Sequence, residues 1–80
     1  MKYLLFTNFS TGLKHNSEYN SLKAVYESIQ QLVEDENLDI KAEMPQYIEE
    51  IEKHLDENDD YVGQLSNGTW YHIQPHPVFV

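Results

Sequence analysis

The chain has 80 residues, which is enough for one hydrophobic core, so a single domain over residues 1–80 is expected. It contains no cysteine, which excludes disulfides and thiolate metal sites as sources of stability. Five lysines, no arginine and 14 acidic residues give a net charge of −9, and this balance disfavours direct binding of nucleic acid or of an anionic membrane.

The sequence also lacks apolar segments of the length that membranes require. The run at residues 3–6 is shorter than the roughly 7–15 apolar residues of a secretory signal peptide, and no run approaches the roughly 20 of a membrane span. We therefore expect a cytoplasmic protein.

Residues 2–9 are predicted to form the first strand. The apolar side chains at residues 3–6 point alternately to both faces, which is typical of an inner strand covered on both sides. Residues 10–12, Ser-Thr-Gly, are predicted to form a turn. The weak pattern of residues 13–19 fits either a loop or a short second strand that makes a hairpin with the first.

A first helix is predicted over residues 21–36. Its apolar residues recur at the spacing of one helical face, and they are Leu22, Val25, Tyr26, Ile29, Leu32 and Val33. Asn20 is expected to cap the first turn, with Tyr19 folding onto Ala24 as a hydrophobic staple. Asn37 suits the left-handed position that ends a helix.

A second helix is predicted after a linker at residues 38–43. Pro45 fits its first turn, where the missing N–H removes no hydrogen bond, and the helix should end near Glu57 or Asn58. Its apolar stripe consists of Met44, Tyr47, Ile48, Ile51 and Leu55.

The C-terminal part is predicted to be a hairpin around the Asn-Gly pair at residues 67–68. A two-residue loop between residues 60–66 and 69–74 would pair Leu65 with Trp70. We expect the face that carries these two side chains to meet the helices. The opposite face would then expose an apolar strip, formed by Val62, Tyr71 and Ile73.

Together these elements predict an α+β fold. It would be a two-layer sandwich in the order β-α-α-β-β, with a three-stranded mixed sheet and both helices on one face. The first strand would run parallel to the first strand of the hairpin, because two helices connect them. Residues 75–80 contain two prolines and are expected to form an extended tail.

The middle of the chain is strongly acidic. Residues 34–60 hold 12 of the 14 acidic residues and two of the five lysines, so their net charge is −10. A solvated helix face that keeps a small protein soluble would explain this pattern. Like charges at i, i+3 and i+4 weaken a helix, however, which favours a surface for a positively charged partner. The residues assigned to partner binding are Glu49, Glu50, Glu52, Asp56, Glu57, Asp59, Asp60 and Tyr71.

The end of the second predicted helix partly matches a calcium-binding loop. Asp56, Asn58 and Asp60 match the first three ligands of an EF-hand loop. Tyr61 and Asn67 stand where that loop requires Gly and a bidentate Glu, so only loose, weak cation binding remains as an alternative.

No residue pattern points to catalysis, a cofactor or zinc. His72 and His76 are four residues apart, but Pro75 and Pro77 exclude the helix that would align them on one metal. The chain has no cysteine nucleophile, no G-x-S-x-G motif and no glycine-rich loop for phosphate. We expect no enzymatic activity and neither a cofactor nor a metal.

The sequence therefore predicts a small non-enzymatic protein that binds a basic, nucleic-acid-handling protein through its acidic residues. In charge and size alone it resembles the small acidic inhibitors that bacteriophages and mobile elements direct against restriction or CRISPR nucleases. That resemblance implies an inhibitor of a basic nuclease. The alternative is a homo-oligomeric structural or accessory module, such as a homodimer. It would associate through the exposed face of the hairpin and the apolar C-terminal residues Val78, Phe79 and Val80.

Overall fold

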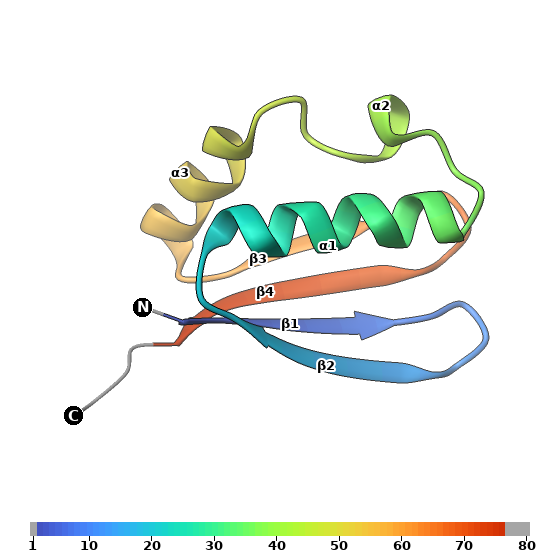
Figure 1. Ribbon diagram of the computed structural model, residues 1–80, viewed down its shortest axis with the longest axis horizontal. Helices are drawn as coiled ribbons and strands as arrows, with labels where there is room; N and C mark the ends of the chain where they lie inside the picture. Colours follow the sequence, from blue (N-terminus) through green and yellow to red (C-terminus); the bar gives the residue numbers. More distant parts are fainter. Residues whose placement is uncertain (1, 77–80) are drawn as a thin grey trace.

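The computed structural model describes residues 2–76 as strands and helices arranged in two layers (Figure 1). The elements in chain order are β1 (Lys2–Asn8), β2 (Lys14–Tyr19), α1 (Leu22–Asp35), α2 (Ile40–Glu43), α3 (Ile48–Asn58), β3 (Tyr61–Gln64) and β4 (Trp70–His76). α1 and α3 are the longer helices, whereas α2 is a single turn. Among the described residues, no helix is long and apolar enough to cross a membrane.

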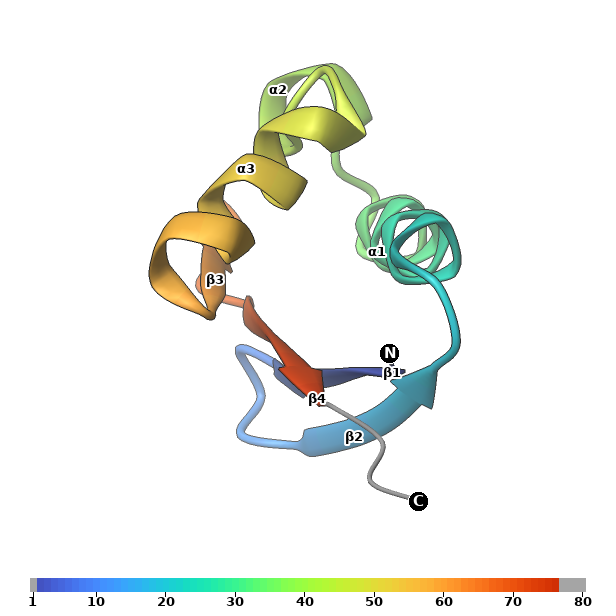
Figure 2. The same ribbon diagram turned by 90° about the vertical axis from the view of Figure 1, so that its left-hand side faces the viewer.

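The four strands form one antiparallel sheet in the order β2-β1-β4-β3. All three helices lie on the same face of this sheet, and the other face is open (Figure 2). The predicted α+β class is confirmed, whereas the three-stranded mixed sheet is wrong. The segment left open as a loop or strand forms β2, and β1 pairs with β4 in the antiparallel sense instead of running parallel beside β3.

The two hairpin turns have the same backbone conformation. The backbone N–H groups of Phe9 and Leu65 each donate to the carbonyl four residues later, at 2.8 and 2.7 Å. The enclosed loops, residues 10–12 and 66–68, each end in a glycine with a left-handed φ, +96° in the first and +94° in the second. This is the three-residue loop with a glycine bulge, in which only the third residue must have a positive φ.

The three-residue loop corrects the predicted register of the second hairpin. Leu65 does not pair with Trp70; Gln64 does. A shift of one residue turns a strand's side chains to the other face of the sheet. Tyr71 and Ile73 therefore face the helices and are buried, whereas Trp70 lies on the open face with 39 % of its surface exposed.

The core lies between the sheet and one face of each long helix. α1 buries the predicted apolar stripe, led by Val25, Ile29 and Val33, all with 0 % exposure. Ser21, not the predicted Asn20, caps this helix: its Oγ accepts a hydrogen bond from the backbone N–H of Ala24 at 3.2 Å. Buried apolar side chains on β1, β3, β4 and α3 complete the core, including Leu5, Leu65, Tyr71, Ile73, Ile51 and Leu55.

The second helical region is divided at Pro45. The predicted linker contains α2, capped by Asp39, and α3 begins only at Ile48. Met44 is extended, with φ −120° and ψ 152°, because a residue before proline is disfavoured in the helical conformation. α3 ends as predicted at Asn58, and Asp59 follows in the left-handed region with φ 60°.

Strand β4 continues further than predicted. It includes Pro75 and ends at His76, where an extended tail had been expected. Alternate residues of an antiparallel strand direct their backbone groups to opposite neighbours, and Pro75 falls on the side of β3. Since β3 begins at Tyr61, opposite Ile73, no hydrogen bond is lost at the proline. The rest of the predicted tail, residues 77–80, lies outside the described residues.

Gly63 of β3 makes room for the ring of Tyr71 on β4. The two residues are opposite each other, and a Cβ added at Gly63 would overlap the Cζ, Oη and Cε1 atoms of Tyr71. Tyr71 is one of the largest side chains in the core with less than 2 % exposure, and its ring stacks against that of Tyr61 with centroids 6.2 Å apart. The glycine therefore determines how the buried tyrosine sits in the core.

We predict that Gly63→Ala destabilises the protein by about 1–3 kcal/mol, because the methyl group displaces a packed ring. Elsewhere in a strand the same change would stabilise, since alanine loses less backbone entropy than glycine. Urea unfolding measures the effect, and Gln64→Ala on the exposed side of the strand is the control. In a Tyr71→Leu background the cost should largely disappear; a cost that persists there would show that the ring is not its cause.

A second prediction concerns alkaline pH. Burial, with a smaller contribution from neighbouring Tyr61, raises the pKa of Tyr71 above the ordinary tyrosine value. The Tyr71 phenol loses its proton at about pH 10 in the unfolded chain and keeps it in the folded chain. The folded state therefore loses stability as the pH rises above that value. Tyr71→Phe should flatten the fall of the urea midpoint with pH, and Tyr47→Phe, at a tyrosine that is 57 % exposed, should not. Parallel profiles for all three proteins would contradict this.

Candidate functional site

Four of the acidic residues between 34 and 60 have local structural contacts. Asp35 accepts a hydrogen bond from Gln31, one turn earlier in α1, and Asp39 caps α2. Glu36 and Glu43 reach the turn between β3 and β4. These four carboxylates therefore have hydrogen-bond partners within the fold.

The turn between β3 and β4 is fixed by two carboxylates. Glu43 accepts hydrogen bonds from both the backbone N–H of Ser66, at 2.9 Å, and its hydroxyl. The hydroxyl of Thr69, which is completely buried, donates to Glu36 at 3.3 Å and accepts from the N–H of Ser10 at 3.2 Å. The end of α1, α2 and both hairpin turns are thus joined at one end of the sheet.

The remaining acidic residues of the predicted site lie on α3 and at its end. We define the acidic surface as its six exposed members, Glu49, Glu50, Glu52, Asp56, Glu57 and Asp59. Asp60 is half-buried, with its carboxylate 3.4 Å from Nε2 of His72. Tyr71 does not belong to this surface: the register of the hairpin buries it in the core with 1 % exposure.

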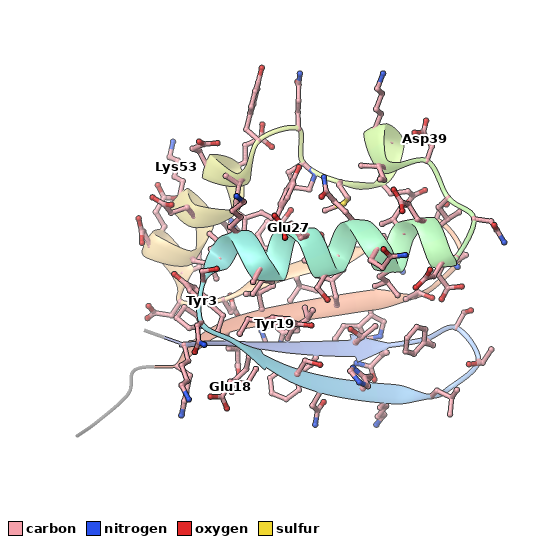
Figure 3. The ribbon with its side chains drawn as sticks, viewed as in Figure 1. Tyr3, Glu18, Tyr19, Glu27, Asp39 and Lys53 are labelled. Carbon is pink, nitrogen blue, oxygen red and sulfur yellow. The ribbon has the colours of Figure 1, made fainter. Side chains whose placement is uncertain are left out.

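The acidic surface has no lysine partner among the described residues. The lysine ion pair among the described residues joins Lys2 to Glu18, at 2.8 Å, on β1 and β2. Near the acidic surface, the carboxylate of Asp60 lies 3.4 Å from Nε2 of His72. Lys53 is the one lysine on α3, and its side chain points away from the molecule (Figure 3). Within residues 2–76, no lysine is therefore within ion-pair distance of these carboxylates.

These charges oppose the helix that carries them. Glu52 and Asp56 are four residues apart and repel each other, and the last turn of α3 contains no basic residue to favour the helix dipole. Glu49 and Glu50 in the first turn act in the favourable sense. The helix is held by its packed side, where Ile51 and Leu55 are 0 % and 4 % exposed.

The acidic surface lies at one edge of the molecule. α3 packs against β3, and β3 is the strand farthest from β2 in the sheet (Figure 2). Six of the 14 acidic side chains are therefore collected beside one sheet edge, whereas the strand at the other edge, β2, carries one lysine and one glutamate.

The residues considered for calcium do not converge. Asp56 and Asn58 are two apart on α3 and so project from different sides of it. The amide of Asn58 donates to the carbonyl of His54 at 3.2 Å. Within residues 2–76, no group of three or more His, Asp or Glu side chains could hold a metal ion.

Sequence reasoning predicted an exposed face of the hairpin and placed Val62 on it correctly, but assigned Tyr71 and Ile73 to that face in place of Trp70. Trp70, placed in the core by the predicted register, lies there with Val62, which is 57 % exposed. A shallow hollow of about 390 Å³ on this face is bordered by Phe6, Asn8, Lys14, Asn16, Trp70, His72 and Gln74. The side chains of residues 70–74 alternate between the two faces of the sheet. Which of them lie on the open face can be predicted only when the length of the preceding loop is known.

Mutations of the two kinds of carboxylate are predicted to have opposite effects on stability. Glu43→Gln should destabilise the protein by about 1 kcal/mol, because the contacts with Ser66 lose the carboxylate charge that strengthens both hydrogen bonds. Asp56→Asn removes the same charge from the last turn of α3 and should be neutral or stabilising by about 0.3–1 kcal/mol. Thermal and urea unfolding compare them. Equal effects would mean that net charge, and not local contact, governs both changes.

Comparisons with known proteins add no assignment: no family model matches the chain, and no curated protein and no solved structure is significantly similar to it.

Proposed function

We propose that the protein is a non-enzymatic binding protein whose acidic surface engages a basic, nucleic-acid-handling protein and inhibits it. The observation that supports the proposal is a set of six exposed carboxylates on and just after α3, without lysine partners among the described residues. Those toward the end of the helix, such as Glu52 and Asp56, reduce its stability. A positively charged partner would supply the neutralisation that the fold does not.

The geometry suits a basic groove. α3 spans 11 residues and about 16 Å at a rise of about 1.5 Å per residue, and it presents carboxylates along this length. Proteins that bind nucleic acid carry lysine and arginine clusters that neutralise successive phosphates. A row of carboxylates on a rigid helix competes for the same cations, and occupation of the groove would block nucleic acid.

Electrostatic attraction of this kind accelerates association and depends on ionic strength. Because the acidic surface is exposed, its attraction is screened by salt far more than a buried pair would be. The partner is therefore characterised by a basic surface and by salt-sensitive binding.

A second candidate function is self-association through the open face of the sheet. Trp70 and Val62 are exposed there, which favours contact with an apolar surface. Tyr71 and Ile73, which the sequence analysis assigned to this strip, are buried and do not contribute. Residues 78–80, the other part of that hypothesis, lie outside the described residues.

The proposed function is tested with two triple variants that each remove three negative charges. Glu49→Gln, Glu52→Gln and Asp56→Asn remove three of the six charges of the acidic surface; Glu27→Gln, Glu34→Gln and Asp35→Asn remove three charges at exposed positions on α1. Immobilised proteins are exposed to a nuclease-treated bacterial lysate at low salt, and the retained proteins are identified by mass spectrometry. A specific basic protein should be retained by the wild type and the α1 variant but not by the α3 variant.

The purified partner then provides the decisive measurement. Its affinity should fall by about tenfold or more between low and physiological salt, and duplex DNA should compete with the acidic surface for it. Affinity that is independent of salt, or equal for both triple variants, would contradict the proposed function.

A further inference from the structure

Strand β2 forms a free edge of the sheet that is exposed and nearly neutral. It is six residues long, and four of its residues, 14–16 and 18, are exposed. The opposite edge strand, β3, has only four residues and directly follows the acidic surface on α3. An unpaired strand edge can be extended by another strand, and β2 carries one lysine and one glutamate, so the charges of the strand itself balance.

The hairpin turn determines which groups of β2 are available. Phe9 and Leu13 form a hydrogen-bonded pair across the β1–β2 turn. Hydrogen-bonded and non-bonded pairs alternate along an antiparallel ladder, so His15, Ser17 and Tyr19 bond to β1. Residues 14, 16 and 18 consequently direct their backbone N–H and C=O groups outward from the sheet.

This alternation restricts how two copies of β2 could pair. Only residues with outward-facing backbone groups can stand opposite one another in hydrogen-bonded pairs. A two-fold axis at Asn16 places Asn16 opposite its own copy and Lys14 opposite the second copy's Glu18, twice by symmetry. Moving the register by two residues in either direction leaves only two such pairs within the strand and removes the match of opposite charges.

We propose that two copies of this protein associate through their β2 edges, in antiparallel register about Asn16, to form a continuous eight-stranded sheet. Lys14 and Glu18 lie on the same face of β2, the open face of the sheet, since they pair with Asn8 and Leu4 of β1. Glu18 lies on the side opposite the helices (Figure 3). Cross-strand pairs of opposite charge stabilise a sheet, whereas like charges directly opposite destabilise it.

The charge distribution of the whole molecule is compatible with this arrangement. β2 and the acidic surface are at opposite edges of the sheet, so the two acidic surfaces of a dimer lie at its far ends. Glu18 already accepts a hydrogen bond from Lys2 at 2.8 Å, and its exposed carboxylate has a second oxygen for the second copy's Lys14. The acidic surfaces remain accessible to another partner in such a dimer.

Charge exchange tests the proposal directly. Sedimentation equilibrium from micromolar to millimolar concentration should give a dimer for the wild type. Lys14→Glu and Glu18→Lys should each weaken dimerisation by about tenfold or more, because each places like charges opposite one another twice. An equimolar mixture of the two variants should form a heterodimer, since each position then meets an opposite charge. Lys23→Glu and Glu27→Lys, at exposed positions on α1, are the matched controls and should leave dimerisation unchanged.

A single introduced cysteine tests the register, because the chain contains none of its own. Asn16→Cys places two thiols beside the two-fold axis and should be linked rapidly by a short bis-maleimide. Lys14→Cys places its thiols about 14 Å apart along the strands and should be linked much more slowly. A wild-type monomer at all concentrations would overturn the proposal and identify Lys14 as a residue that protects the edge. Equal linking of both cysteines, or no heterodimer in the mixture, would overturn the register.

Discussion

The glycine that closes each hairpin loop sets which side chains of the sheet face the helices. Gly68 takes a left-handed φ as the third loop residue, so Leu65 bonds to Thr69 and the pairing of β3 with β4 follows. That register buries Tyr71 and leaves Trp70 on the open face. Gly12 acts in the same way at the first hairpin, where it determines which backbone groups of β2 point to the free edge. Core, open face and edge chemistry therefore all depend on two turns.

The acidic residues that sequence reasoning treated as one block have two physical roles. Glu36 and Glu43 bring negative charge to the loop between β3 and β4, where Thr69 and Ser66 donate hydrogen bonds to them. These hydrogen bonds fix the turn between β3 and β4 against the helices. The carboxylates of α3 have no comparable partner among the described residues, and the helix depends on the burial of Ile51 and Leu55. This second group is exposed on one helix and available to another molecule.

Helices were predictable from the sequence because their apolar residues recur over several turns, and the stripe of α1 was identified residue by residue. The sheet was less predictable, since β2 is almost wholly polar and its strand signal is supplied by pairing with β1. The Asn-Gly pair indicated a turn but not its length. The loop is one residue longer than predicted, and this difference reversed the faces of Trp70 and Tyr71. The exposed acids of α3 could be located from the helical pattern. The sequence could not distinguish these acids from Glu43, because Glu43 makes its structural contact with Ser66, which is distant in sequence.

Segregation of charge links the two proposed surfaces. The energy of repulsion between copies depends on the distance between their charges, and screening at physiological salt acts over about 8 Å. Because three strand spacings of about 4.8 Å separate β2 from β3, the acidic surface lies beyond this range from the β2 edge. A chain with a net charge of −9 can therefore present one edge that tolerates another copy. The same separation would leave two acidic helices at the ends of a longer sheet, each accessible to a basic partner.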